Sequence, residues 1–218
     1  MPQVSSQPFR DRVEAGELLA ERLAQYRDRD DVVVLALPRG GVPVAREVSR
    51  ALGVPFDVYV VRKLGVPGHE ELAMGAIATG GVRQVNHDVV DALGIPGNVI
   101  DAVAAREQRE LERREQDYRG NRGPLSLANR SVILVDDGLA TGATMYAAVL
   151  AVRRRHPAAI VVAVPVAAGA TVARLRQVVD DVVCCMVPEV FRAVGEWYED
   201  FLPTSDTEVK TALLRAGF

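Results

Sequence analysis

The chain has 218 residues, of which 49% are hydrophobic and 25% charged, with a formal net charge of −3 and a pI near 5.7. A chain of this length can bury one good core, so we expect a single domain over 1–218. The small net charge excludes a general electrostatic attraction to nucleic acid or to anionic membranes. The first residues lack the pattern of a secretory signal and no apolar run is long enough to span a membrane, so we expect a cytoplasmic protein without a membrane partner.

Two apolar elements open the chain. Residues 9–26 have the apolar spacing of an amphipathic helix that lies on the body of the fold. Residues 32–37, VVVLAL, predict a buried strand of a parallel sheet. This strand leads directly into a Pro-Arg-Gly-Gly loop at 38–41. The helix expected after the loop has Pro43 near its first turn and Gly53 at its end, where each residue is favoured.

A third strand is expected at 56–61, and a long polar stretch follows at 64–72. The proline, glycine and charged residues of this stretch, with His69 as a solvated side chain, predict a loop of the length that usually serves as a lid or binding loop. Apolar runs at 75–78 and 82–86 flank a Thr-Gly-Gly turn and predict a β-hairpin.

A highly charged helix is expected at 99–118. Residues 98–101, NVID, resemble a capping arrangement at its start. Opposite charges recur at four-residue spacing, with Glu110 between Arg106 and Arg114, so the helix should be exposed and rich in ion pairs. Its acids offset its arginines, which argues against RNA binding. We predict no catalytic role for this helix.

The most informative stretch runs from 131 to 144, SVILVDDGLATGAT. Its apolar run at 132–135 predicts a buried strand that delivers Asp136 and Asp137 to the carboxyl end of the strand. A loop of small residues follows, and a helix is expected at 145–155. The free N–H groups and the dipole at a helix start form an anion site, and glycines let a phosphate approach closely. This segment therefore predicts a site for a sugar phosphate.

The two carboxylates would repel a phosphate, so they need another partner. They either accept hydrogen bonds from vicinal hydroxyl groups or help to hold a hydrated divalent cation, and the sequence leaves both roles open. Thr141 and Thr144 add hydroxyl donors to the loop. The pattern is neither the Rossmann glycine pattern nor the Walker loop, which needs a lysine after its last glycine.

Further strands are expected at 160–166 and 182–187, separated by a helix at 169–179. Strands that alternate with helices in this way predict a largely parallel sheet. Cys184 and Cys185 are neighbours on the last of these strands and should point to opposite faces, so we expect them to fill the core rather than to pair with each other or bind a metal.

The stretch 132–144, VILVDDGLATGAT, resembles the phosphoribosyl pyrophosphate (PRPP) motif of the type I phosphoribosyltransferases, and the resemblance extends over about 32–200. It implies an α/β fold with a central, mostly parallel sheet flanked by helices and with a flexible lid loop or hairpin. The core would cover about 32–187. A small C-terminal hood would cover about 188–218 together with the N-terminal helix.

The resemblance also implies roles for individual residues. Asp136 and Asp137 would hold the ribose hydroxyl groups and a Mg²⁺ ion. Arg39 would face the leaving pyrophosphate. Lys63 comes just past the strand expected at 56–61, and from this position it either contacts the same pyrophosphate or is a surface lysine. The remaining binding residues belong to the pyrophosphate loop and to the loop around the 5-phosphate: Pro38, Gly40, Gly41, Gly138, Leu139, Ala140, Thr141, Gly142, Ala143 and Thr144.

Two interpretations of Phe191 stay open. By resemblance to the purine-salvage members of the family, where an aromatic residue follows a proline by three positions, Phe191 would stack on the acceptor base. The match is imperfect, because Gly195 lies one residue too far along and Glu199 replaces the usual aspartate. In the other interpretation, Phe191 packs with Trp197, Tyr198 and Phe201 under the C-terminal helix.

The resemblance implies an enzyme that transfers a phosphoribosyl group from PRPP to a nitrogenous base, with Mg²⁺ as cofactor, release of pyrophosphate and a homodimeric assembly. The alternative is a non-catalytic protein of the same fold that senses PRPP or a nucleotide. A minor alternative is a hydrolase that uses water as acceptor. The intact loop at 38–41 and Lys63 favour the transferase, since a sensor need not stabilise a leaving pyrophosphate.

Overall fold

Five parallel strands form the central sheet of the structure, a computed structural model that describes residues 7–215. The strands follow the order β2–β1–β6–β7–β8, and every neighbouring pair runs in parallel. This confirms the predicted α/β fold with a largely parallel sheet. The bounds are β1 Val32–Ala36, β2 Phe56–Val58, β6 Ser131–Val135, β7 Ala159–Val166 and β8 Asp181–Met186.

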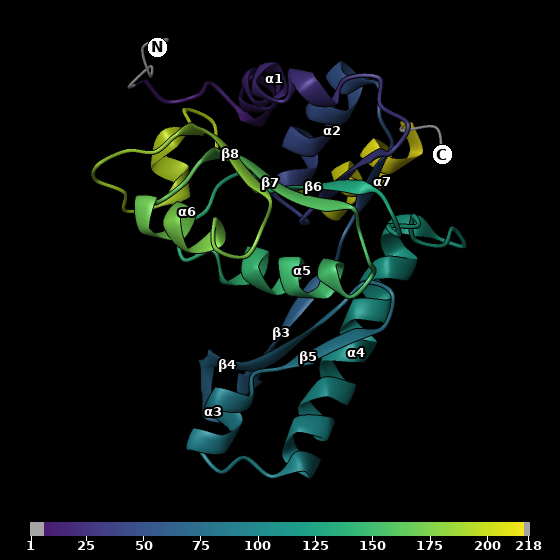
Figure 1. The fold of residues 1–218 in the computed structure, drawn as a ribbon, viewed down its shortest axis with the longest axis vertical. Helices are drawn as coiled ribbons and strands as arrows, with labels where there is room; N and C mark the ends of the chain where they lie inside the picture. The colour runs from purple at the N-terminus through teal and green to yellow at the C-terminus, as the bar shows by residue number, and fades with distance from the viewer. Residues whose placement is uncertain (1–6, 216–218) are drawn as a thin grey trace.

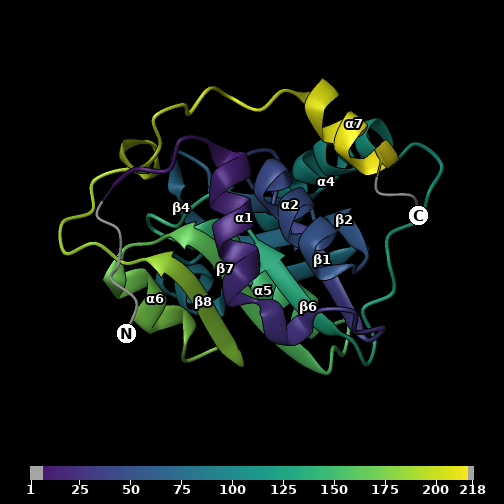
Figure 2. The same ribbon diagram turned by 90° about the horizontal axis from the view of Figure 1, so that it is seen from above.

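Helices cover both faces of this sheet: α1 and α2 lie on one face, and α5 and α6 lie on the other (Figures 1 and 2). The core is divided in the same way, because successive strand residues point to opposite faces. Ile133 packs in the cluster that contains the α2 side chains, whereas Leu134 packs in the cluster that contains the α5 side chains. The bounds are α1 Arg12–Arg22, α2 Gly41–Leu52, α5 Ala143–Arg153 and α6 Gly169–Leu175.

A second, antiparallel sheet is built from β3 Val61–Val66, β4 His69–Ala78 and β5 Val82–Val85. The hairpin predicted at 75–86 is confirmed as the β4–β5 pair. The strand predicted at 56–61 is divided between β2 of the first sheet and the start of β3.

The polar loop predicted at 64–72 is wrong, because most of it belongs to β3 and β4. Val66 pairs with His69, so Pro67 and Gly68 are the two central residues of a tight turn, and Gly68 has a φ of 79°. Proline at the first central position and a positive-φ glycine at the second suit a type II turn. In the sequence alone, the same proline and glycine are equally typical of a loop.

The long helix α4 Gly97–Arg119 and the short helix α3 His87–Ala92 accompany the antiparallel sheet (Figure 1). The sequence analysis did not predict α3. The predicted capping arrangement at 98–101 is wrong, since Pro96 occupies the cap position and the Asp101 carboxylate accepts a hydrogen bond from Arg83. Of the predicted ion pairs on α4, Glu110 with Arg114 is present, but Arg106 contacts Glu107 instead.

Aromatic side chains near the C-terminus pack against the N-terminal segment. The ring centroids of Phe9 and Tyr198 are 5.5 Å apart, and those of Tyr198 and Phe201 are 5.0 Å apart. The expected packing under the C-terminal helix is therefore wrong, because α7 Asp206–Arg215 contacts α2, α4 and β2 instead. Two 3₁₀ turns complete the described elements, η1 Ala24–Tyr26 and η2 Val194–Trp197.

Cys184 and Cys185 are both free and half-buried on β8. Cys184 packs against the core cluster on the α5 side of the sheet and Cys185 against the clusters on the other side, which confirms that they point to opposite faces. Burial raises the pKa of the Cys184 thiol to about 11 and that of Cys185 to about 12. In the part of the chain that the structure describes, no helix is long and apolar enough to cross a membrane.

Candidate functional site

Two loops leave the parallel sheet side by side at its carboxyl edge. β1 and β6 are neighbours with Ala36 opposite Val135, and the Leu37 N–H donates to the Val135 carbonyl at 2.9 Å. The loop 38–41 and the acidic pair that follows β6 therefore begin at the same level of the sheet. Open α/β sheets bind their ligands at this edge.

The contact between the two loops requires glycine at positions 40 and 41. A Cβ atom on Gly40 would lie 2.1 Å from Asp137 Oδ2, and one on Gly41 would lie 2.6 Å from the Val135 carbonyl oxygen and 2.8 Å from Asp136 Cα. A larger residue at either position would have to displace the acidic pair or its strand. The structure thus brings together two motifs that are about a hundred positions apart in the sequence.

Asp136 and Asp137 form a mostly buried acidic pair in which Asp136 Oδ1 accepts the Asp137 N–H at 2.9 Å. Burial raises the pKa of Asp136 well above its ordinary value, and the charge of Asp137 raises it further. Burial also raises the pKa of Asp137, but the Arg12 guanidinium opposes this shift. Arg12 thus stabilises the charged form of Asp137 within a buried pair of carboxyl groups.

Arg12 is a side-chain partner of the acidic pair that was not predicted from the sequence. Its Nε donates to Asp137 Oδ2 at 2.9 Å and its Nη2 lies 2.8 Å from the same oxygen, while the two side chains are only 11% and 14% exposed. Asp11 accepts hydrogen bonds from the N–H groups of the first turn, which makes Arg12 the first residue of α1. Helical spacing gives no signal for a contact between residues 125 positions apart.

The loop 138–142 leads into α5 and presents open backbone donors. The Leu139 N–H donates to the Val166 carbonyl at 2.9 Å, which fixes the loop to the end of β7. Within residues 7–215, the N–H groups of Thr141 and Gly142 have no protein acceptor. Gly142 has a φ of 66° at the start of α5, and Thr144 is exposed in the first turn of that helix. Open N–H groups at a helix start can bind a phosphate.

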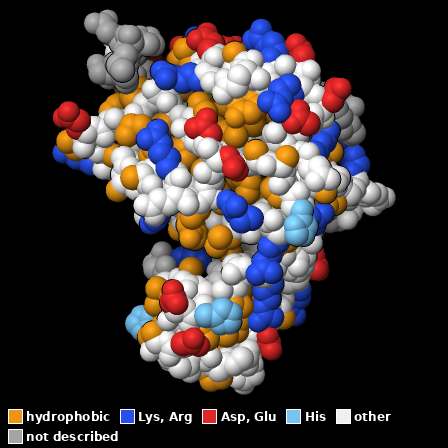
Figure 3. Space-filling model, viewed as in Figure 1, with side chains coloured by type: hydrophobic (Ala, Val, Ile, Leu, Met, Phe, Trp, Pro, Cys, Tyr) orange, Lys and Arg blue, Asp and Glu red, His pale blue; other side chains and the backbone are white. Residues whose placement is uncertain are grey.

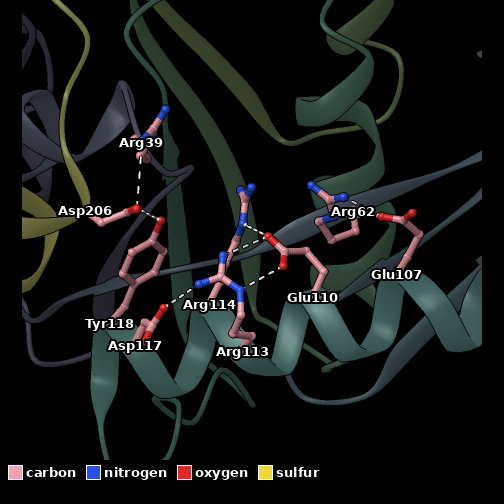
Figure 4. A network of polar contacts seen from close by, with 9 residues as sticks. All are labelled: Arg39, Arg62, Glu107, Glu110, Arg113, Arg114, Asp117, Tyr118 and Asp206. Atoms are coloured by element: carbon pink, nitrogen blue, oxygen red, sulfur yellow. Dashed lines mark hydrogen bonds and ion pairs between the residues drawn. The ribbon is translucent and has the colours of Figure 1, made fainter.

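Arg39 lies beside Tyr118 and Asp206 (Figure 4). Its Nη1 is 3.9 Å from Asp206 Oδ2, and the Tyr118 hydroxyl donates to Asp206 Oδ1 at 2.6 Å. Because Arg39 and Asp206 are both about half exposed, this long ion pair is weak, and Arg39 can exchange it for an anionic ligand. Among the described residues, the N–H of Gly40 has no protein acceptor either, so the loop 38–41 offers both a cation and an open donor.

Tyr118 of α4 contacts the same aspartate, Asp206, that lies beside Arg39. Burial, followed by the hydrogen bond to Asp206, raises the pKa of Tyr118 to about 12. The hydrogen bond from Tyr118 in turn lowers the pKa of Asp206. Tyr118 therefore remains a neutral donor that orients Asp206 next to Arg39.

Lys63 and Phe191 lie on elements other than the two loops. Lys63 is exposed on β3, opposite Ala76 in the antiparallel sheet, whereas the sequence analysis placed it just past a strand of the parallel sheet. Phe191 is half-buried and packs against the aromatic cluster around Phe9 and Tyr198, as the packing interpretation expects. His69 is exposed at the start of β4.

A groove of about 560 Å³ separates α5 from the antiparallel sheet (Figure 3). Thr141 and Arg174 line it, and Arg174 Nη2 donates to the Thr141 carbonyl. The lining includes neither the acidic pair nor the loop 38–41. The groove therefore reaches the loop 138–142 from its outer side.

Three comparisons with known proteins agree on the family. A family model described as a phosphoribosyl transferase domain matches residues 11–200. Two curated proteins from strains of Mycobacterium tuberculosis, MT0597 and Rv0571c, are provisionally named as phosphoribosyl transferases. Each is 48% identical over 208 residues, which cover 95% of this chain and 47% of the relative, so the chain spans about half the length of these relatives. The crystal structure of TT1426 from Thermus thermophilus has a TM-score of 0.87 and 44% identity, and the match covers 96% of this chain and 99% of that one. The chain belongs to the phosphoribosyl transferase domain family.

Proposed function

We propose that this protein transfers the phosphoribosyl group of PRPP to a nitrogenous base or a related acceptor and releases pyrophosphate. The observation that carries this proposal is the contact between the loop 38–41 and the acidic pair, with the open N–H groups of the loop 138–142 following directly along the chain. PRPP has phosphates at both ends and two hydroxyl groups between them. The site combines a pair of hydroxyl acceptors with anion donors on both the loop 38–41 and the loop 138–142.

Each part of PRPP has a matching group in this arrangement. Asp136 and Asp137 would accept hydrogen bonds from the ribose hydroxyl groups, because ionised carboxylates are strong acceptors. The N–H groups of Thr141 and Gly142 would bind the 5-phosphate, together with the rest of the predicted loop. The Gly40 N–H and the Arg39 guanidinium would bind the pyrophosphate.

The reaction breaks the bond between C1 of the ribose and the pyrophosphate oxygen, and it forms a bond between C1 and a nitrogen of the acceptor. The electron pair of the broken bond leaves with the pyrophosphate, whose negative charge increases. Arg39 and the Gly40 N–H would stabilise this charge in the transition state. The two loops hold the sugar between them, so positioning and electrostatics supply the catalysis without a covalent intermediate.

The carboxylates fit only a limited role toward Mg²⁺. In the part of the chain that the structure describes, no cluster of three or more His, Cys, Asp or Glu side chains could hold a metal ion. Mg²⁺ usually keeps several waters and is held by one or two carboxylates and by substrate phosphates. Asp136 and Asp137 would supply that carboxylate contribution. The cation would neutralise charge on the pyrophosphate.

The acceptor and the assembly are further parts of the proposal. Phe191 is the candidate for stacking on a base. It packs in the cluster of Tyr198, whose hydroxyl donates to the Asp137 carbonyl, and it would leave this packing in order to stack. By family resemblance, the partner in solution is a second copy of the chain.

A regulatory protein that senses PRPP or a nucleotide is the second candidate. The position of Lys63 favours it, because Lys63 lies on β3 of the antiparallel sheet. Among the described residues, Arg39 is then the only cation predicted for the pyrophosphate that lies on the loops at the edge of the parallel sheet. A sensor would bind PRPP with the same acidic pair but would release no pyrophosphate.

A screen of nitrogenous bases for pyrophosphate release from PRPP in the presence of Mg²⁺ tests the proposal. We expect at least one base to give release that the double variant Asp136→Asn and Asp137→Asn loses. Lys210→Met, an exposed substitution on α7 outside the candidate site, is the matched control and should leave release unchanged. Tight PRPP binding without release for any base would favour the sensor, and no PRPP binding would refute both candidates.

A further inference from the structure

Arg12 joins three parts of the molecule. Its Nε and Nη2 contact Asp137 Oδ2, and its Nη1 donates to the Leu202 carbonyl at 2.8 Å. The guanidinium carbon also lies 4.0 Å from the centroid of the Phe201 ring, a distance typical of a cation–π contact. One side chain of α1 thus contacts the PRPP motif and the segment 198–202.

The segment 198–202 is attached to the same aspartate through a second contact. The Tyr198 hydroxyl donates to the backbone carbonyl of Asp137 at 2.5 Å. The chain before α1 is bonded to this segment as well, because the Phe9 carbonyl accepts the Glu199 N–H at 2.8 Å and the Arg10 carbonyl accepts the Asp200 N–H at 2.9 Å. The start of α1 and the segment 198–202 therefore form one unit that contacts both the side chain and the backbone of Asp137.

The contacts of Arg12 fall on one oxygen of the Asp137 carboxylate. Arg12 Nε and Nη2 both contact Oδ2, and among the described residues no N–H group is bonded to Oδ1. The other side-chain contact of this carboxylate is with Asp136. A guanidinium that contacts a carboxylate through two nitrogens fixes its orientation more strongly than a lysine can. A mostly buried carboxylate without this partner would have an uncompensated charge.

We propose that Arg12 is a positioning residue for the sugar site: it holds the Asp137 carboxylate through Oδ2, leaves Oδ1 as the acceptor for a sugar hydroxyl, and couples this carboxylate to the segment 198–202. This inference rests on the proposed function, since it names PRPP as the ligand. The site would then require Arg12 of the N-terminal helix in addition to the residues of the PRPP motif.

Calorimetric titration with PRPP in MgCl₂ tests the role of Arg12 in the variants Arg12→Met and Arg12→Lys. Arg12→Met should weaken binding by about 10-fold to 100-fold, the effect expected when a charge-assisted contact that positions an acceptor is lost. Arg12→Lys keeps the charge but not the planar fork, so its affinity should lie between those of the wild type and Arg12→Met.

Arg62→Met is the matched control, because Arg62 also contacts a mostly buried carboxylate, that of Glu107, outside the site. It should leave PRPP affinity unchanged in the folded protein. The inference is overturned if folded Arg12→Met binds PRPP like the wild type, or if Arg62→Met weakens binding as much as Arg12→Met does.

Thermal unfolding of Arg12→Met, Asp137→Asn and the double variant separates this inference from the proposed function. If Arg12 holds Asp137, the decrease in melting temperature in the double variant should be smaller than the sum of the two single decreases. Additive decreases would overturn the inference even if PRPP binds. Absence of PRPP binding to the wild type, with clear coupling of the two variants, would refute the proposed function and leave the contact between Arg12 and Asp137 established.

Discussion

At the carboxyl edge of the parallel sheet, Arg12 reaches Asp137 across 125 positions of the chain, whereas on the outer side of α4 Arg113 and Arg114 reach Glu110 within one helical turn. The first pair is mostly buried, and the second group is 31% to 58% exposed. Water screens the exposed pairs, so they add little to stability, while a buried carboxylate depends on its partner. The same chemical contact therefore compensates a buried charge in one region and adds little to stability in the other.

The helix α4 contains both kinds of ion pair. Near its end, Arg119 is buried and donates from Nε to Asp57 of β2 at 2.9 Å and from Nη1 to Glu115 at 2.9 Å. Six residues earlier, Arg113 contacts Glu110 and Asp117 (Figure 4) and is 58% exposed. Because Arg119 and Arg113 lie on the same helix but differ in burial, they allow a direct comparison of a buried and an exposed ion pair.

The largest effect is expected from Arg119→Met, which leaves Asp57 buried without its cation. Removal of one partner of a buried pair should lower the free energy of unfolding by about 3 to 5 kcal/mol. The matched variant Arg113→Met should lower it by less than about 1 kcal/mol, because its pair is exposed. Urea unfolding of both variants measures the difference, and equal losses would contradict the comparison.

The double variant Asp136→Asn and Asp137→Asn tests the sheet edge as a ligand site. The amides keep the shape of the carboxylates but remove their charge, so PRPP binding should weaken by about 1 to 3 kcal/mol for each charged hydrogen bond that is lost. Calorimetry with Mg²⁺ present measures this change. The same carboxylate-to-amide change on the outer side of α4, Glu112→Gln, is the control, and unchanged PRPP affinity in the double variant would remove these residues from the site.

Replacing Arg39 with Ala tests whether the loop 38–41 stabilises the leaving group. If pyrophosphate gains charge in the transition state, kcat should fall by about 10² to 10³ while KM for PRPP changes less. Lys63→Ala, for which the sequence predicts the same effect, should have a smaller one because Lys63 lies on β3. Steady-state kinetics with the acceptor that the base screen identifies would decide, and a loss of PRPP affinity at full kcat would make Arg39 a ground-state anchor.

The parallel sheet was predictable because β1, β6, β7 and β8 each contain a continuous apolar run, and because the special loops follow two of these runs directly. The meeting of Gly40 with Asp137 could also be expected, since parallel neighbours end at the same edge. The antiparallel sheet was harder. Pro67 and Gly68 favour either a tight turn or a loop, and only the pairing of Val66 with His69 distinguishes them.

The contact between Arg12 and Asp137 could not be predicted from the sequence. Spacing along a helix identifies residues that share a face, but it does not identify the distant segment that this face contacts. The packing of Tyr198 against Phe9 illustrates the same limit, because one of the two interpretations of the sequence expected the aromatic residues under the C-terminal helix. Local pattern predicted the elements and the motif, whereas only the long-range packing shows that Arg12 contacts Asp137.

The smallest effect is expected from Glu110→Gln on the outer side of α4, and pH provides its test. Hydrogen bonds from Arg113 and Arg114 lower the pKa of Glu110 to about 2. Because the carboxyl group is more acidic in the folded chain than in the unfolded chain, its contribution to stability is present above its ordinary pKa and is lost as the pH falls towards the folded value. Wild type should therefore exceed Glu110→Gln by at most about 1 kcal/mol at pH 7, and the difference should shrink between pH 5 and pH 3. Glu112→Gln is the control, since Glu112 contacts Gln108 rather than an arginine. Urea unfolding at these pH values measures both variants, and the same pH dependence in both would show that the exposed arginines of α4 add nothing to stability.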